Sequence, residues 1–171
     1  MTQPDLTRLT PADASVALRS LPRRFRAATR PIDDPQVEAW AEIPGPDGLS
    51  AIAHVAAATR ALTRLEVALH RILTREDPAL DAAVTEMGDA PPPDRIATVD
   101  HELEALAEAA HGLADRAGSV PASDWGRRGR APDGSSVEAL DVVKGAVRVG
   151  LAHLEAAGAA MDRARGEDED G

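Results

Sequence analysis

Two of the five histidines in this 171-residue chain lie where an imidazole could bind a metal ion or a ligand. Around His153 a polar residue recurs every seven positions, as at Arg148 and Glu155, which marks the solvent face of a helix. At about 100° per residue, His153 lies about 140° from that polar line and should point inward. His54 lies about 80° from a line of arginines on its own helix, an edge position that can also face inward. The other histidines fall outside the apolar stripes and are expected at the surface: His70, His101 and His111.

Imidazoles in these two places have two alternative uses. A neutral imidazole is a common ligand for zinc and other divalent metals, and a catalytic zinc site normally has three protein ligands. Two inward histidines on different helices are, however, more often hydrogen-bonded core side chains than metal ligands. The chain has no cysteine, so any thiol chemistry must use the sulfur of a cosubstrate. Spacing alone leaves a metal site and a structural pair both open.

The elements that position these side chains are expected to be helices. Hydrophobic residues make up 43% of the chain and aromatic residues only 2%. A core of alanine, leucine and valine suits closely packed helices better than a sandwich of strands. Four segments have apolar residues at alternating steps of three and four. We therefore predict an all-α four-helix bundle over residues 10–163, with a flexible N-terminus at 1–9 and a disordered acidic tail at 164–171.

Capping residues and prolines indicate where these helices begin. The first helix should start with Thr10 as its N-cap, and Asp13 is placed to complete a capping box. Pro22 lacks a backbone N–H, so this helix is expected to bend or restart near Ser20. The predicted N-caps of the three later helices are Asp47, Asp94 and Ser135, the last within a capping box over residues 135–138.

The ends of the helices are less sharply marked. The second helix should run to about Arg75 and the fourth to about Met161. Glycine and proline in the segment 121–134 predict a loop before the fourth helix.

Charge and hydropathy narrow the classes of partner. The formal net charge is −10, which disfavours sequence-independent binding to nucleic acid. A basic run over residues 23–30 is the exception, and such a run is typical of a solvated helix face. No apolar run approaches the roughly 20 residues of a membrane span, and the N-terminus lacks the apolar core of a signal peptide. We expect a cytoplasmic protein that binds neither nucleic acid nor membrane.

Three short strings resemble the DinB-like (YfiT-like) superfamily of helical bundles. They are GPDGLSAIAHV around His54, VGLAHLEAA around His153, and ASDWGRRGRAPDG before the last helix. The order and spacing of the strings extend the resemblance over about residues 10–163. This family includes mycothiol- and bacillithiol-dependent transferases and proteins similar to maleylpyruvate isomerase.

The resemblance implies a metal site built from three histidines. In such proteins a histidine of the second helix and two histidines four residues apart on the fourth helix bind zinc or nickel. His54 and His153 match two of these positions, but the position four residues before His153 is Val149, which cannot bind a metal. Pro46 stands where the family has a tryptophan. The expected cofactor is therefore either none or a weakly bound divalent metal.

Three functions remain open from the sequence. The favoured one is a family member with a degenerate metal site that binds a small molecule or a partner without full metal catalysis. The second is a metal-dependent thiol S-transferase or isomerase with a mycothiol-type cosubstrate, in which His54 and His153 are ligands. The third is a structural bundle that assembles with itself, for instance as a homodimer. Val149, Trp125 and Arg127 are candidates for lining the cleft, although loop anchoring is the favoured role of the last two.

Overall fold

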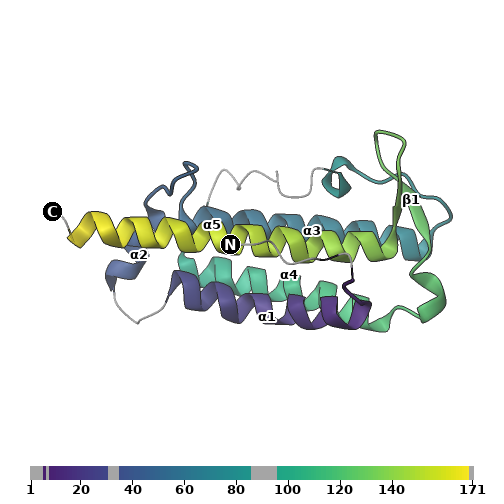
Figure 1. Cartoon of the computed structure of the whole chain (residues 1–171), viewed down its shortest axis with the longest axis horizontal. Helices are drawn as coiled ribbons and strands as arrows, with labels where there is room; N and C mark the ends of the chain where they lie inside the picture. The colour runs from purple at the N-terminus through teal and green to yellow at the C-terminus, as the bar shows by residue number, and fades with distance from the viewer. Residues whose placement is uncertain (1–5, 7, 31–34, 86–95, 170–171) are drawn as a thin grey trace.

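The computed structural model describes residues 6, 8–30, 35–85 and 96–169 of the chain. Four long helices dominate it: α1 (Pro11–Thr29), α3 (Ala51–Thr74), α4 (Val99–Ser119) and α5 (Ala139–Glu169). The smaller elements are α2 (Pro35–Glu42), the 3-10 turns η1 (Ala82–Val84) and η2 (Ala122–Asp124), and the strands β1 (Arg128–Arg130) and β2 (Ser136–Glu138). The long helices lie side by side, with α2 at one end and the strands at the other (Figure 1).

The long helices surround one main hydrophobic core. Helices α1 and α3 each pack against both α4 and α5. The core consists of leucine, valine, isoleucine and many alanines, and Phe25 is the chain's single phenylalanine. Small side chains let the axes approach closely: a Cβ added at Gly150 of α5 would lie 2.5 Å from Cδ1 of Leu21 on α1. The prediction of an all-α four-helix bundle is confirmed.

Helix α1 begins as predicted but continues through its proline. The side chain of Thr10 accepts a hydrogen bond from the backbone N–H of Asp13, and Asp13 accepts one from the backbone N–H of Thr10. Helix α1 does not restart near Ser20, since it continues past Pro22 to Thr29. Leu18, Leu21 and Phe25 are buried on both sides of Pro22, so core packing holds the helix together across the missing N–H.

The next two long helices, α3 and α4, have N-cap residues other than those predicted. Ser50, not Asp47, caps α3, because its hydroxyl accepts the N–H of Ala53. Thr98 caps α4. The predicted cap Asp94 lies outside the described residues.

The ends of α5 also differ from expectation. The strand β2 occupies most of the predicted capping box, and α5 starts at Ala139, three residues later than Ser135 as N-cap would place it. The segment 121–134 is not wholly a loop, because it contains η2 and β1. Helix α5 continues to Glu169, through residues assigned from sequence to a disordered tail. Near the other terminus, Leu6 and Leu9 pack partly buried against the core.

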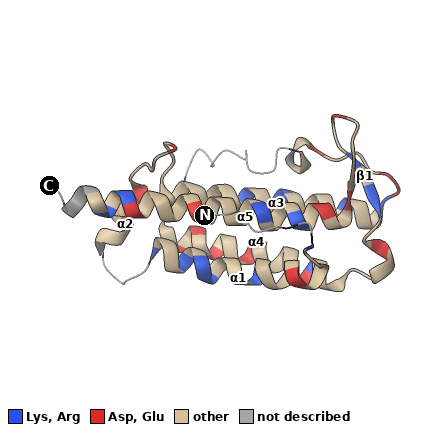
Figure 2. Cartoon of the chain, in the orientation of Figure 1, with Lys and Arg blue, Asp and Glu red and all other residues tan. Residues whose placement is uncertain are grey.

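Basic and acidic residues are interspersed along the helices of the bundle (Figure 2). Arg26 and Arg30 of the basic run both pair with Asp100 of α4, so part of that run ties α1 to its neighbour. Within the described residues, no helix combines the length and hydropathy needed to cross a membrane.

Candidate functional site

His54 and His153 meet between α3 and α5. Their Nδ1 atoms are 3.2 Å apart, and the two rings are tilted by 46° with centroids 5.5 Å apart. His54 is 2% exposed and His153 is 8% exposed, so both orientations predicted from helix geometry are confirmed. The three other histidines are exposed, also as predicted. The fold therefore brings together two imidazoles that are 99 residues apart in the chain.

The carboxylate of Asp47, which the sequence analysis did not assign to the site, contacts the second ring nitrogen of His54. Oδ2 of Asp47 lies 3.1 Å from Nε2 of His54, and Oδ1 lies 3.4 Å from the same nitrogen. The side chain of Asp47 is half exposed, whereas that of His54 is buried. Burial would raise the pKa of Asp47, but the backbone N–H of Leu49 and the neighbouring His54 outweigh it and hold that pKa below its usual value.

The turn that carries Asp47 is seated on α5. Gly45 and Leu49 close it with a backbone hydrogen bond of 2.8 Å, and the side chain of Arg163 donates to the carbonyl of Gly45. A Cβ at Gly45 would lie 2.7 Å from Cβ of Ala160, so only glycine allows this approach. Gly48 has φ +86°, a left-handed conformation that glycine adopts without strain. The turn is thereby held where Asp47 reaches His54.

The surroundings of His153 favour its neutral form. Burial lowers the pKa of His153, His54 lowers it further, and the more distant Asp47 has an opposing effect. Its Nε2 atom is buried, and no group in the described part of the chain forms a hydrogen bond with it. Buried polar atoms in folded proteins nearly always have a hydrogen-bond partner, so one is expected for this nitrogen.

The residues present fit a metal site only in part. Two nitrogens bound to one tetrahedral zinc at about 2.0–2.1 Å would lie about 3.3 Å apart, close to the observed Nδ1 separation. Val149, one turn before His153, stands where the family resemblance implies a third ligand; it is 1% exposed and packs with Ala61 in a small cluster apart from the main core. Among the described residues, no three histidine or carboxylate side chains are grouped so as to hold a metal ion. This donor set does not complete a three-ligand catalytic site.

Arg127 and Trp125 lie away from the histidine pair. Arg127 donates from Nε to the carbonyl of Ile72 and from a terminal nitrogen to that of Arg75, so it caps the last turn of α3. Ile72 is 18 residues after His54, or about 27 Å along the helix. Trp125 packs against the edge of the core. Arg127 therefore anchors its loop, the role that the sequence favoured over a place at the cleft mouth.

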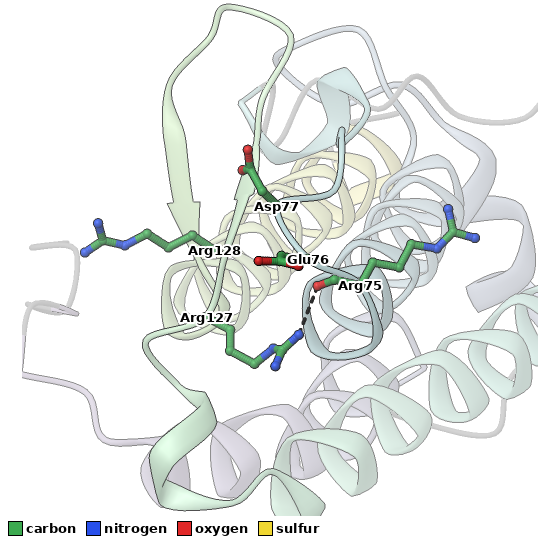
Figure 3. A pocket seen from close by; sticks show the side chains of 5 residues that line it. All are labelled: Arg75, Glu76, Asp77, Arg127 and Arg128. Carbon is green, nitrogen blue, oxygen red and sulfur yellow. Dashed lines mark hydrogen bonds between the residues drawn. The ribbon is translucent and has the colours of Figure 1, made fainter.

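Arg127 does line a shallow pocket of about 340 Å³ at that far end of α3. The other lining residues are Arg75, Glu76, Asp77 and Arg128 (Figure 3). The guanidinium groups of Arg75 and Arg128 point away from each other, and Arg128 is paired with Glu138. The charges in this pocket therefore do not converge on one point.

Sequence reasoning missed Asp47 as part of the site because its turn looked like a helix cap. The available signal was the turn Pro46-Asp47-Gly48, which places a carboxylate seven residues before His54. Only the folded turn shows that Asp47 faces the ring rather than the helix backbone.

Comparisons with known proteins show the fold. No family model matches the chain, and no curated protein matches it. Among solved structures it is similar to YfiT from Bacillus subtilis, described as a probable metal-dependent hydrolase with an unusual four-helix bundle topology. The TM-score is 0.71 and the identity 16%, over 97% of this chain and 93% of that one. At this identity the similarity shows the fold, a four-helix bundle like that of YfiT, as the sequence resemblance led us to expect.

Proposed function

We propose that this chain is a DinB/YfiT-like bundle with a degenerate metal site, which binds a small molecule or a partner without full metal catalysis. The observation that carries the proposal is the arrangement at α5. His54 and His153 face each other at 3.2 Å, and a buried valine occupies the third ligand position one turn before His153. Two neutral imidazoles hold a divalent cation much more weakly than three ligands do.

The unpartnered Nε2 of His153 supports a binding role over a purely structural one. A pair kept only for packing gains nothing from a buried nitrogen that lacks a hydrogen bond, because such an atom costs about 1–3 kcal/mol. A bound molecule that bonds to this nitrogen would remove that cost.

A second candidate is a divalent-metal-dependent thiol S-transferase or isomerase with a mycothiol-type cosubstrate. Two features favour it: the separation of the two Nδ1 atoms matches that of two ligands on one ion, and Asp47 bonds the other nitrogen of His54. Metal-binding histidines commonly have a carboxylate in that place. The missing third ligand ranks it below the first proposal.

Metal analysis of untagged protein separates the two functions. We expect substoichiometric zinc and nickel in the wild-type protein and no further loss in His54→Ala. Stoichiometric zinc or nickel that is lost in His54→Ala would overturn the proposal and favour the metal-dependent enzyme. His101→Ala, at an exposed histidine, is the matched control for adventitious binding.

A further inference from the structure

We infer that Asp47 is a positioning residue that fixes the tautomers of both buried histidines, in a relay running Asp47–His54–His153. In this relay His54 is protonated at Nε2, His153 is protonated at Nδ1, and Nε2 of His153 is an unprotonated acceptor. The inference rests on the proposed function, since it concerns the same pair of imidazoles, and it specifies what that pair offers to a ligand.

The proton of His54 is placed by the carboxylate. An ionised carboxylate only accepts hydrogen bonds, and Oδ2 of Asp47 lies 3.1 Å from Nε2 of His54. Nε2 must therefore carry the proton, because an unprotonated nitrogen would present its lone pair to a negative oxygen. A neutral imidazole has one N–H, so Nδ1 of His54 is left as an acceptor.

The proton of His153 follows from that of His54. The two Nδ1 atoms are 3.2 Å apart, and two facing lone pairs at this distance would repel each other. Nδ1 of His153 must therefore donate to Nδ1 of His54, which leaves Nε2 of His153 without a proton.

The surroundings of His153 agree with this assignment. Its Nε2 atom is buried and has no hydrogen-bond partner among the described residues. With the opposite tautomers, Nε2 of His153 would carry a buried N–H that has no acceptor. The lone pair on Nε2 of His54 would also face the negative carboxylate of Asp47. The atom that the pair leaves open is thus an acceptor, so a molecule that completes the site carries an O–H, N–H or S–H donor.

The relay can be measured directly by ¹⁵N NMR of the imidazole nitrogens. The full chain is freed of metal with EDTA and studied at about pH 8, above the ordinary histidine pKa of about 6.5. Resonances are assigned with His54→Gln and His153→Gln. We expect the shift of a protonated nitrogen at Nε2 of His54 and Nδ1 of His153, and that of an unprotonated nitrogen at Nε2 of His153. A protonated Nε2 on His153 would overturn the inference.

Asp47→Asn should invert the relay. The asparagine oxygen can still accept the N–H of Leu49, so its amide group, a donor, faces Nε2 of His54. His54 must then carry its proton on Nδ1, and His153 must carry its proton on Nε2. Replacing the carboxylate behind a histidine by an amide is known to impose the wrong tautomer in this way.

Asp133→Asn is the matched control. Asp133 lies in a second Pro-Asp-Gly turn, with Gly134 at φ +85°, and accepts the N–H of Ser135 as Asp47 accepts that of Leu49. No hydrogen bond joins Asp133 to a histidine in the described part of the chain, so this variant should keep the wild-type pattern. An Asp47→Asn protein that keeps the wild-type pattern would contradict the positioning role. Because the NMR spectra are recorded on metal-free protein, they test the tautomers independently of whether the protein functions with a metal. A failure of the tautomer inference is therefore distinguishable from a failure of the proposed function.

Discussion

His153 is buried beside another imidazole, whereas the carboxylate of Asp47 contacts His54. A proton on His153 would therefore lose hydration without gaining a counter-ion of its own. Burial is the main reason that the pKa of His153 is lowered, and His54 adds to the effect. The histidine is thus suited to accept or donate hydrogen bonds as a neutral ring.

This lowered pKa predicts a pH-dependent stability. In the unfolded chain His153 returns to an ordinary pKa of about 6.5, so between that value and the lower folded value the unfolded state binds more protons. The contribution of His153 is fully present above about pH 6.5 and is lost as the pH falls toward the folded pKa. We expect urea unfolding between about pH 8 and pH 5 to show a falling free energy of unfolding.

The variant His153→Gln isolates this effect, since it should lose that part of the slope. His111→Gln, at an exposed histidine, should retain it. Identical slopes in the wild-type protein and His153→Gln would show that His153 does not titrate with folding.

At the scale of elements, the turn between Pro44 and Ser50 is positioned by its contact with α5. Gly45 lies against Ala160, so a side chain there must push the turn away from Ala160 and carry Asp47 away from His54. The same contact explains why a residue outside the long helices can belong to the site.

Gly45→Ala should therefore destabilise the protein by about 1–3 kcal/mol, the usual cost of overpacking. Gly126→Ala is the control, because a Cβ there meets nothing within 4 Å and should change the free energy of unfolding by no more than about 0.5 kcal/mol. Both values come from urea unfolding. Equal stabilities of the two variants would mean that the turn is not held by this contact.

Periodicity sufficed to predict the long helices because each buries one continuous apolar face. It failed where contacts with residues distant in the sequence determine the local structure. Packing on either side of Pro22 keeps α1 whole, and pairing of Gly129 with Val137 turns a predicted capping box into a strand. Helix α2 is not among the predicted helices, because it is only eight residues long and so short a segment shows little periodicity.

The candidate site was half predictable for a related reason. The angular position of each histidine on its own helix correctly predicted that His54 and His153 point inward. The contact of Asp47 with His54 depends on how a turn folds over α5, and no local pattern encodes that.

For the whole molecule, a single core predicts a single unfolding transition. The two tryptophans of the chain test this, because Trp40 lies on α2 and Trp125 lies beside β1, at opposite ends of the bundle (Figure 1). Both pack against the same core. We expect Trp40→Phe and Trp125→Phe, each leaving one reporter, to show fluorescence midpoints in urea equal to the midpoint by circular dichroism of the same variant. Distinct midpoints within one variant would indicate that the two ends unfold separately.

The central claim is that the bundle retains two of three metal ligands and that Val149 occupies the third position. Calorimetric titration of zinc into Val149→His tests it most directly. The added imidazole would share a helix face with His153, so the account predicts zinc binding at least about tenfold tighter than in the wild-type protein, or about 1.4 kcal/mol.

Val142→His is the matched control, since Val142 is also buried on α5 but lies eleven residues before His153, about 16 Å along the helix. It should bind zinc no better than the wild-type protein. A Val149→His protein with wild-type zinc affinity would contradict the account.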